Sequence, residues 1–186
     1  MTGPMTGPQK PSRWTLWLPL VLFLGFAGLA MSGLFRPAPR AVESAMIGKA
    51  LPQFTLRAAV PDRPGLATAD LADGKPRLLN VFASWCLPCA VEAPQLAALQ
   101  AEGVEIVGVA IRDRPEDVAA FLARHGNPFT RIGADDRSAV QMGIGSSGVP
   151  ETFVIDGAGK IRYQHIGEIR PEHLAVLRAK LKEAGS

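Results

Sequence analysis

The stretch Phe82-Ala83-Ser84-Trp85-Cys86-Leu87-Pro88-Cys89-Ala90 contains the only two cysteines among the 186 residues of the chain. The apolar run that ends in this stretch, residues 78–83, predicts a short buried strand. After it, Val91, Leu96 and Leu99 recur at helical spacing, with alanines between them. The cysteines are therefore predicted at a strand-to-helix junction, where unpaired amides and the positive end of the helix dipole stabilise a thiolate.

The spacing of the two cysteines favours redox chemistry. Two intervening residues close a loop too small to restrict the unfolded chain much, which argues against a purely structural disulfide. A metal site is the other alternative. Cys86, at the helix tip, is predicted to be the exposed attacking nucleophile. Cys89, one turn further in, is predicted to be the buried resolving thiol that closes the internal disulfide and releases the partner.

The distribution of charge separates an N-terminal leader from a nearly neutral remainder. The chain has 20 basic and 17 acidic residues, and its formal net charge is +3. All of the acidic residues follow position 40, and only 16 of the basic residues do. A nearly neutral domain gives no electrostatic reason to expect nucleic-acid binding. Its length, about 140 residues, is enough for a core that needs no disulfide for stability.

Residues 14–35 are uncharged and predict a transmembrane anchor. As a helix they would be about 33 Å long, enough for a hydrocarbon core of about 30 Å. A cleaved signal peptide is the alternative, since Gly28, Ala30 and Ser32 could serve a peptidase, but signal cores usually have about 7–15 residues. Residues 1–13 are then predicted to be a short cytoplasmic tail, 36–45 a proline-stiffened linker and 46–186 the folded domain.

Strand and helix patterns alternate along the rest of the chain. Strands are predicted over 77–83, 104–111, 129–132, 152–155 and 160–166, helices over 87–101, 115–124, 138–142 and 171–184, and a small hairpin within 46–76. This order, with Cys-x-x-Cys at the first strand-to-helix turn, matches the thioredoxin fold, an α/β fold whose central mixed β-sheet is flanked by helices. Here it would carry an N-terminal β-hairpin extension and a single N-terminal transmembrane helix.

Three stretches narrow the resemblance to one family. They are Asn80 to Cys89, Gly148-Val149-Pro150-Glu151-Thr152-Phe153, and Ile155-Asp156-Gly157-x-Gly159-x-Ile161-Arg162-Tyr163. Together they resemble the membrane-tethered reductases of c-type cytochrome maturation, the DsbE/CcmG family. The Gly-Val-Pro-Glu-Thr-Phe run is far more specific than Cys-x-x-Cys alone. The pair Leu87-Pro88 departs from the commonest pair of that family, which bears on the reduction potential and not on the reaction.

The resemblance implies further substrate-binding residues. Val149-Pro150 resembles the cis-proline junction of thioredoxin-like proteins, where the backbone of the residue before the proline pairs with an extended substrate. An ordinary trans proline at the start of a strand is the alternative. Trp85 is expected to shield the disulfide and to pack against the substrate, rather than to serve only as core.

Thiol exchange also needs a proton acceptor for the resolving thiol, because only its thiolate attacks the mixed disulfide. Ordinary thioredoxins carry a buried aspartate at the position of Asn80, which cannot titrate. Glu92, one helical turn after Cys89, and Glu151, after Pro150, resemble acidic residues peculiar to the maturation family. Each is predicted to be partly buried with a raised pKa and to act as acid and base, and the alternative is a solvated surface carboxylate.

The combined prediction is a membrane-tethered periplasmic thiol:disulfide oxidoreductase that needs no cofactor beyond its cysteine pair. Reduced Cys86 would attack a disulfide in apocytochrome c, at the heme-binding cysteines, or in a partner thiol protein of cytochrome c maturation. The resemblance implies a DsbD/CcdA-like transmembrane thiol reductant as electron donor. The protein would then be a single-pass protein of the inner membrane with its domain facing the periplasm.

Two other functions stay open at this point. One is a general extracytoplasmic thioredoxin-like reductase with other substrates. The other is a copper chaperone on the same fold, with two cysteines and a distant histidine as ligands. His125, His165 and His173 are scattered without ligand spacing and are predicted to be surface residues. A cis-proline beside the thiols would also crowd a metal, so no metal site is predicted.

Overall fold

The computed structural model describes residues 14–34 and 45–186. The chain divides into two parts, residues 1–42 and 43–186, and each is described by itself. The predicted tail at 1–13 and nearly all of the predicted linker at 36–45 lie outside the described residues.

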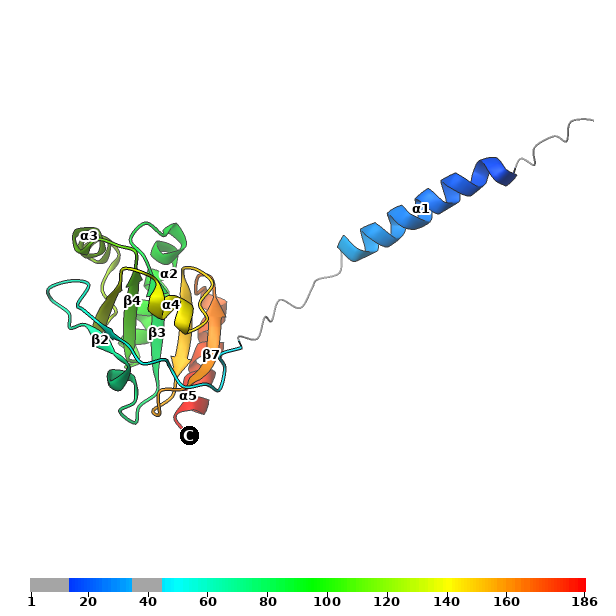
Figure 1. The fold of residues 1–186 in the computed structure, drawn as a ribbon. Helices are drawn as coiled ribbons and strands as arrows, with labels where there is room; N and C mark the ends of the chain where they lie inside the picture. The colour runs from blue at the N-terminus through cyan, green and yellow to red at the C-terminus, as the bar shows by residue number, and fades with distance from the viewer. Residues whose placement is uncertain (1–13, 35–44) are drawn as a thin grey trace, which may run out of the picture. The chain divides into compact units, whose positions relative to one another are not determined.

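The first part contains one described helix, α1 (Trp14–Leu34), which has Pro19 inside it (Figure 1). Over the portion of the chain that the structure describes, no helix combines the length and the apolarity that crossing a membrane requires. The membrane span expected at 14–35 therefore stays a prediction from the sequence.

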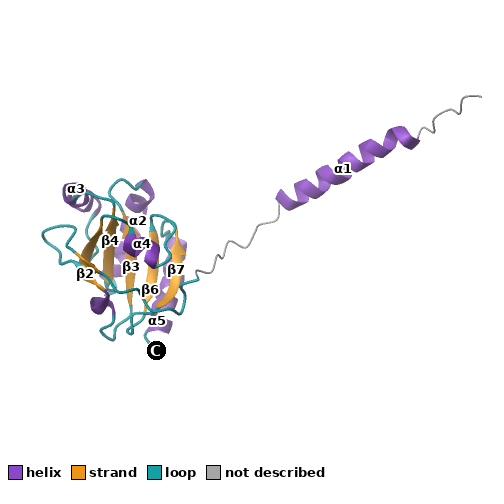
Figure 2. Ribbon diagram, viewed as in Figure 1, coloured by secondary structure: helices purple, strands orange, loops and turns teal. Residues whose placement is uncertain are grey.

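The second part is built on a five-stranded mixed sheet (Figure 2). Its strands lie in the order β5-β4-β3-β6-β7 and are β3 (Arg77–Phe82), β4 (Ile106–Ile111), β5 (Arg131–Asp135), β6 (Glu151–Ile155) and β7 (Ile161–Ile166). Strands β3, β4 and β5 are parallel, whereas β6 runs antiparallel to both β3 and β7. Both β3 and β4 are buried at every position, as strands covered on two faces must be.

Helices cover both faces of this sheet. They are α2 (Leu87–Ala101), α3 (Pro115–His125), α4 (Ala139–Gly143) and α5 (Leu174–Ala184), the last preceded by the 3₁₀ turn η2 (Pro171–His173). Asn80 and Phe82 point to the same face of β3, because side chains alternate along a strand. Asn80 contacts Glu92 of α2, and the ring of Phe82 lies 5.9 Å from that of Phe121 in α3. Both helices therefore cover that face, and Figure 2 shows α4 and α5 on opposite sides of the sheet.

A small hairpin packs against the free edge strand β5. Strands β1 (Thr55–Leu56) and β2 (Leu66–Ala67) pair antiparallel, and the 3₁₀ turn η1 (Thr68–Leu71) follows them. The main chain of the hairpin bonds to β5, with Ala59 N donating to Ile132 O at 3.0 Å. Gly133 permits this approach, since a Cβ there would lie 2.8 Å from the Cβ of Leu56.

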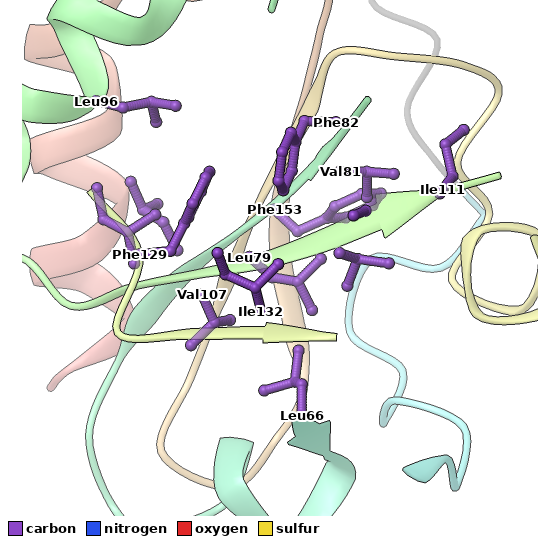
Figure 3. Packing of buried hydrophobic residues seen from close by; sticks show 14 of the residues in the cluster. Leu66, Leu79, Val81, Phe82, Leu96, Val107, Ile111, Phe129, Ile132 and Phe153 are labelled. Atoms are coloured by element: carbon purple, nitrogen blue, oxygen red, sulfur yellow. The ribbon is translucent and has the colours of Figure 1, made fainter. Parts of the chain in front are cut away.

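The core lies on both faces of the sheet. Figure 3 shows side chains from the strands, from the hairpin and from α2 converging, among them Leu66, Phe82, Leu96 and Phe153. The rings of Phe82 and Phe129 stack with their centroids 4.8 Å apart. A domain with this core has its dithiol segment anchored at the end of a fully buried strand.

The thioredoxin fold predicted from the sequence is confirmed, and so is the hairpin extension. The strand expected at 129–132 is instead β5, which begins at Arg131. Phe129 lies outside the strand because its ring stacks on Phe82 and Asn127 Oδ1 accepts its backbone N–H at 3.1 Å. Gly133 and Ala134 are poor strand formers, but they pair with β4 because the hairpin packs on them.

Candidate active site

The dithiol lies between the end of β3 and the start of α2, as predicted. Cys86 is the N-cap of α2, and its Sγ accepts the backbone N–H of Cys89 at 3.2 Å. The two cysteines form a disulfide with an S–S distance of 2.09 Å and a Cα–Cα distance of 5.3 Å. A first-turn amide of α2, that of Cys89, therefore points at Cys86 Sγ, and this environment favours a thiolate once the disulfide is reduced.

Exposure does not separate the two cysteines in this disulfide state. Cys86 is 5% exposed and Cys89 is 3% exposed, whereas Cys86 was expected at an exposed tip. The exposed residues of the segment are Trp85, Leu87 and Pro88. Position, not exposed area, distinguishes the sulfurs, because Cys86 caps the helix and Cys89 lies within its first turn.

Trp85 stands between two grooves on the surface beside Cys86. Its side chain is 60% exposed and lines both of them. The larger groove, about 670 Å³, runs from Cys86 to Arg124 and His125 of α3. The smaller, about 430 Å³, runs toward α4 and the loop that ends at Val149. An indole so exposed offers a large apolar surface next to the disulfide, and its role as a shield or as a substrate contact stays a prediction.

The Val149–Pro150 peptide bond is cis, as the resemblance implied. Pro150 is buried, and half-buried Val149 lines the smaller groove together with Trp85. Among the described residues, the backbone N–H and C=O of Val149 have no hydrogen-bond partner. The structure thus brings Trp85 and Val149 to one groove, with main-chain groups available beside it.

Glu92 is fully buried on the inner side of α2, contrary to the alternative of a solvated surface carboxylate. Its Oε1 accepts from Asn80 Nδ2 at 2.9 Å, and its Oε2 accepts from the backbone N–H of Ile169 at 2.9 Å. Burial raises the pKa of Glu92 to about 7, although both hydrogen bonds favour the charged form and lower it. A carboxyl group with this pKa can accept and release a proton near neutral pH.

A small cavity of about 10 Å³ connects Glu92 to the dithiol. Cys89, Glu92 and Asn80 line it together with apolar residues, among them Phe82 and Phe121. Cys89 and the buried carboxyl group of Glu92 therefore share one space, whose size is close to that of a single water molecule. Whether Glu92 serves as the base for Cys89 stays a prediction at this point.

Glu151 is also buried, but its hydrogen bonds lead elsewhere. Its Oε1 accepts from the backbone N–H and the hydroxyl of Ser147, at 2.9 and 2.5 Å, and its Oε2 accepts from Gln164 Nε2 at 2.7 Å. It lines neither of the two grooves nor the cavity beside Cys89. These contacts fix the loop that leads into Pro150. A direct catalytic role for Glu151 stays a prediction.

Sequence patterns did not single out Asp113, which the structure places at the site. Its Oδ2 accepts from the backbone N–H of Ser84 at 2.5 Å, and its Oδ1 accepts from the Ser84 hydroxyl at 2.7 Å. It thereby ties the loop after β4 to the segment that carries the cysteines. Arg112, beside it, lines both grooves. Both residues directly follow a predicted parallel strand, and the carboxyl ends of neighbouring parallel strands meet at one edge of a sheet.

The histidines are less scattered than the sequence indicated. The rings of His165 and His173 lie 4.5 Å apart, and His125 lines the larger groove. All three are half-buried instead of exposed at the surface. Within residues 14–34 and 45–186, no group of three or more potential ligands is placed to hold a metal ion.

The raised pKa of Glu92 predicts a pH-dependent difference in stability. A folded-state pKa of about 7 against an ordinary value of 4.5 means that the folded protein holds the proton more tightly. The stabilisation is then complete below about pH 4.5 and is lost as the pH rises to about 7. Relative to Glu92→Gln, the oxidised wild type should lose up to about 3 kcal/mol over this range.

Urea unfolding of both proteins across pH 4 to 8 measures this difference, and the other carboxyl groups cancel in the comparison. A constant difference between the two proteins would mean that Glu92 has an ordinary pKa.

Known proteins that resemble this chain are thiol:disulfide interchange proteins, in agreement with a disulfide at a helix N-terminus beside a cis-proline. A family model described as Redoxin matches residues 46–181. The thiol:disulfide interchange protein HelX of Rhodobacter capsulatus is 43% identical over 146 residues, 78% of this chain and 82% of that protein. The thiol:disulfide interchange protein DsbE of Escherichia coli is 40% identical over 165 residues, 86% of this chain and 88% of that protein.

A solved structure of a thiol:disulfide interchange protein also resembles this chain. A Chlorobium tepidum protein assigned as thiol:disulfide interchange protein DsbE matches with a TM-score of 0.61 and 28% identity, over 74% of this chain and 96% of that one. The buried dithiol at a helix N-terminus, the cis-proline and the identities to HelX and DsbE lead to one conclusion. The chain belongs to the Redoxin family and, within it, to the DsbE/HelX thiol:disulfide interchange proteins.

Proposed function

We propose that this protein reduces disulfides in cytochrome c maturation, with Cys86 as nucleophile and Cys89 as resolving thiol. The observation that carries the proposal is the shared cavity of Cys89 and Glu92 behind a Cys86 that caps α2. One sulfur is activated by the helix terminus, and the other has a buried proton acceptor. A structural disulfide would need neither feature.

The chemistry proceeds in two exchange steps. The Cys86 thiolate attacks one sulfur of the substrate disulfide, a mixed disulfide forms, and the first substrate thiolate leaves. Cys89 then gives its proton to the Glu92 carboxylate, and its thiolate attacks Cys86 Sγ. The second substrate thiolate leaves, and the Cys86–Cys89 disulfide is formed. Two electrons have passed from the protein dithiol to the substrate.

The substrate is held beside the disulfide by the surface around Trp85. An extended segment lying in the smaller groove would meet the open N–H and C=O of Val149 on one side and the indole on the other. Leu87, exposed at the start of α2, adds apolar surface next to Cys86. Recognition through main-chain groups and apolar contacts suits a reductase whose substrate presents cysteines in an unfolded stretch.

Two lines of support favour cytochrome c maturation over general reduction. The run Gly148 to Phe153 resembles the maturation family, and relatives named HelX and DsbE cover most of the chain at 40 to 43% identity. The proposed acceptor is the heme-binding cysteine pair of apocytochrome c or a partner thiol protein. The proposed donor is a transmembrane thiol reductant of the DsbD/CcdA kind, which returns two electrons to the disulfide.

The N-terminal segment is proposed to anchor the domain at the periplasmic side of the inner membrane. Residues 14–35 carry no charge, and the described part of this segment is helical. A tether would hold the dithiol next to a membrane-embedded electron donor in an oxidising compartment.

The anchor predicts that the protein stays in the membrane pellet after alkaline carbonate extraction, and that protease degrades the domain in spheroplasts. A variant beginning at residue 41 should appear in the soluble periplasmic fraction when it is fused to a cleavable signal. Release of the complete protein by carbonate would contradict the anchor, and protection from protease would contradict the orientation.

The exchange reaction predicts that Cys89→Ser accumulates mixed disulfides, because Cys86 can attack but nothing resolves the product. Cys86→Ser is the matched control and should trap nothing. The measurement is non-reducing electrophoresis of membranes from cells that express each variant, followed by mass spectrometry of the attached protein. Apocytochrome c or a maturation thiol protein should be attached to Cys86.

Two results would change the proposal. Trapping by Cys86→Ser in place of Cys89→Ser would reverse the roles of the two sulfurs. Attachment of unrelated periplasmic proteins alone would make the protein a general thioredoxin-like reductase.

A further inference from the structure

Asn80 has an unusual set of hydrogen bonds for a fully buried side chain. It lies in the middle of β3 between Leu79 and Val81 and is 0% exposed. Its Nδ2 makes two bonds, to Glu92 Oε1 at 2.9 Å and to Thr152 Oγ1 at 3.0 Å. Its Oδ1 is buried without a partner among the described residues. Buried side-chain oxygens are nearly always bonded, so this one needs an explanation.

The unpaired oxygen acquires two partners if the amide group turns by half a rotation, and Nδ2 then takes the position that has no partner. The two ends of an amide have the same shape but opposite roles, since the oxygen accepts and the nitrogen donates. After the turn, Oδ1 lies opposite Glu92 Oε1 and Thr152 Oγ1. The Thr152 hydroxyl can donate as well as accept, so it fits either orientation. Glu92 fits the turned amide only when its carboxyl group carries a proton.

The contacts of Glu92 favour one of its oxygens, Oε1, as the one that takes the proton. The backbone N–H of Ile169 donates to Oε2, and a backbone N–H cannot accept a hydrogen bond. A proton on Oε2 would face this donor. A proton on Oε1 would face the side chain of Asn80, whose carbonyl can accept it after the turn.

We propose that Asn80 is a positioning residue whose amide turns over each time Glu92 gains or loses a proton. It donates from Nδ2 to the carboxylate and accepts at Oδ1 from the carboxylic acid. This inference rests on the proposed role of Glu92 as the base for Cys89. Asn80 never exchanges a proton itself, and its turn keeps a hydrogen bond between the amide group and Glu92 in each protonation state.

The turn connects to the thiol chemistry through the shared cavity, which Asn80, Cys89 and Glu92 all line. When Cys89 gives its proton to Glu92, the amide turns and holds the new acid, which leaves the thiolate free to attack. Of the charged groups near Glu92, Glu168 raises its pKa, and the facing residues of β3 and β6, Asn80 and Thr152, are neutral. An aspartate at position 80 would add a second charge and could not alternate in this way.

Nuclear magnetic resonance of the oxidised full-length protein in detergent micelles tests the turn without any contribution from thiol titration. Asn80 and Asn127 are the two asparagines of the chain, so their side-chain amides can be labelled and assigned. The nuclear Overhauser effect between the Asn80 amide protons and the Thr152 methyl group should be present above pH 8 and lost below pH 6. The Glu92 carboxyl carbon should titrate with the same midpoint, at about 7.

Two controls are available. In Glu92→Gln, the Asn80 contact should not vary with pH, because no proton is exchanged. Asn127, whose Oδ1 accepts from Phe129 N, should keep one orientation throughout. An Asn80 contact that persists at every pH while Glu92 titrates would overturn the inference and leave the proposed function intact. A Glu92 carbon that does not titrate between pH 4 and 9 would overturn both.

Discussion

The burial of one carboxyl group, that of Glu92, is the constraint on which the rest of the site depends. Its two oxygens are bonded to a strand and to the segment before the last helix, so α2, β3 and the C-terminal region meet at this group. A charged carboxylate out of water is unfavourable, and the two hydrogen bonds offset only part of that cost. Burial therefore raises the pKa of Glu92 to about 7, and this carboxyl group shares a small cavity with Cys89, the thiol that is proposed to lose a proton during exchange.

The residues around Cys86 and in the loop before the cis-proline have contacts of a different kind from those of Glu92. The N-terminus of α2, where Cys86 is the N-cap, is proposed to activate this thiol, and Asp113 holds the segment before it by accepting two hydrogen bonds from Ser84. Glu151 holds the loop before the cis-proline through Ser147 and Gln164. In the proposed mechanism, activation, resolution and substrate binding are carried out by different residues around one disulfide. The two buried carboxylates have different partners, which favours different roles for them.

Much of this could be predicted from the sequence because the signals are local. A single Cys-x-x-Cys between an apolar run and a helical repeat determined the junction, and the run Gly148 to Phe153 indicated the cis-proline. The bounds of β5 could not be predicted, because Gly133 and Ala134 become strand only through pairing and hairpin packing. Asp113 carries no motif of its own, and the burial of Cys86 depends on tertiary neighbours. That Glu151 turns toward Ser147 is likewise a matter of side-chain direction, which spacing does not specify.

The most direct test of the account is the pH dependence of resolution in single variants and in a double variant. Stopped-flow reduction of a model disulfide from pH 5 to 9 should show an acid limb with a midpoint near 7 in the wild type. Glu92→Gln should remove this limb and slow resolution by about tenfold to a hundredfold. This effect is at or below the low end of the range for a general base, because water can substitute. Glu151→Gln should keep the limb, and the double variant should be the slowest. A double variant with the wild-type rate and pH profile would contradict the account, because solvent would then be the base.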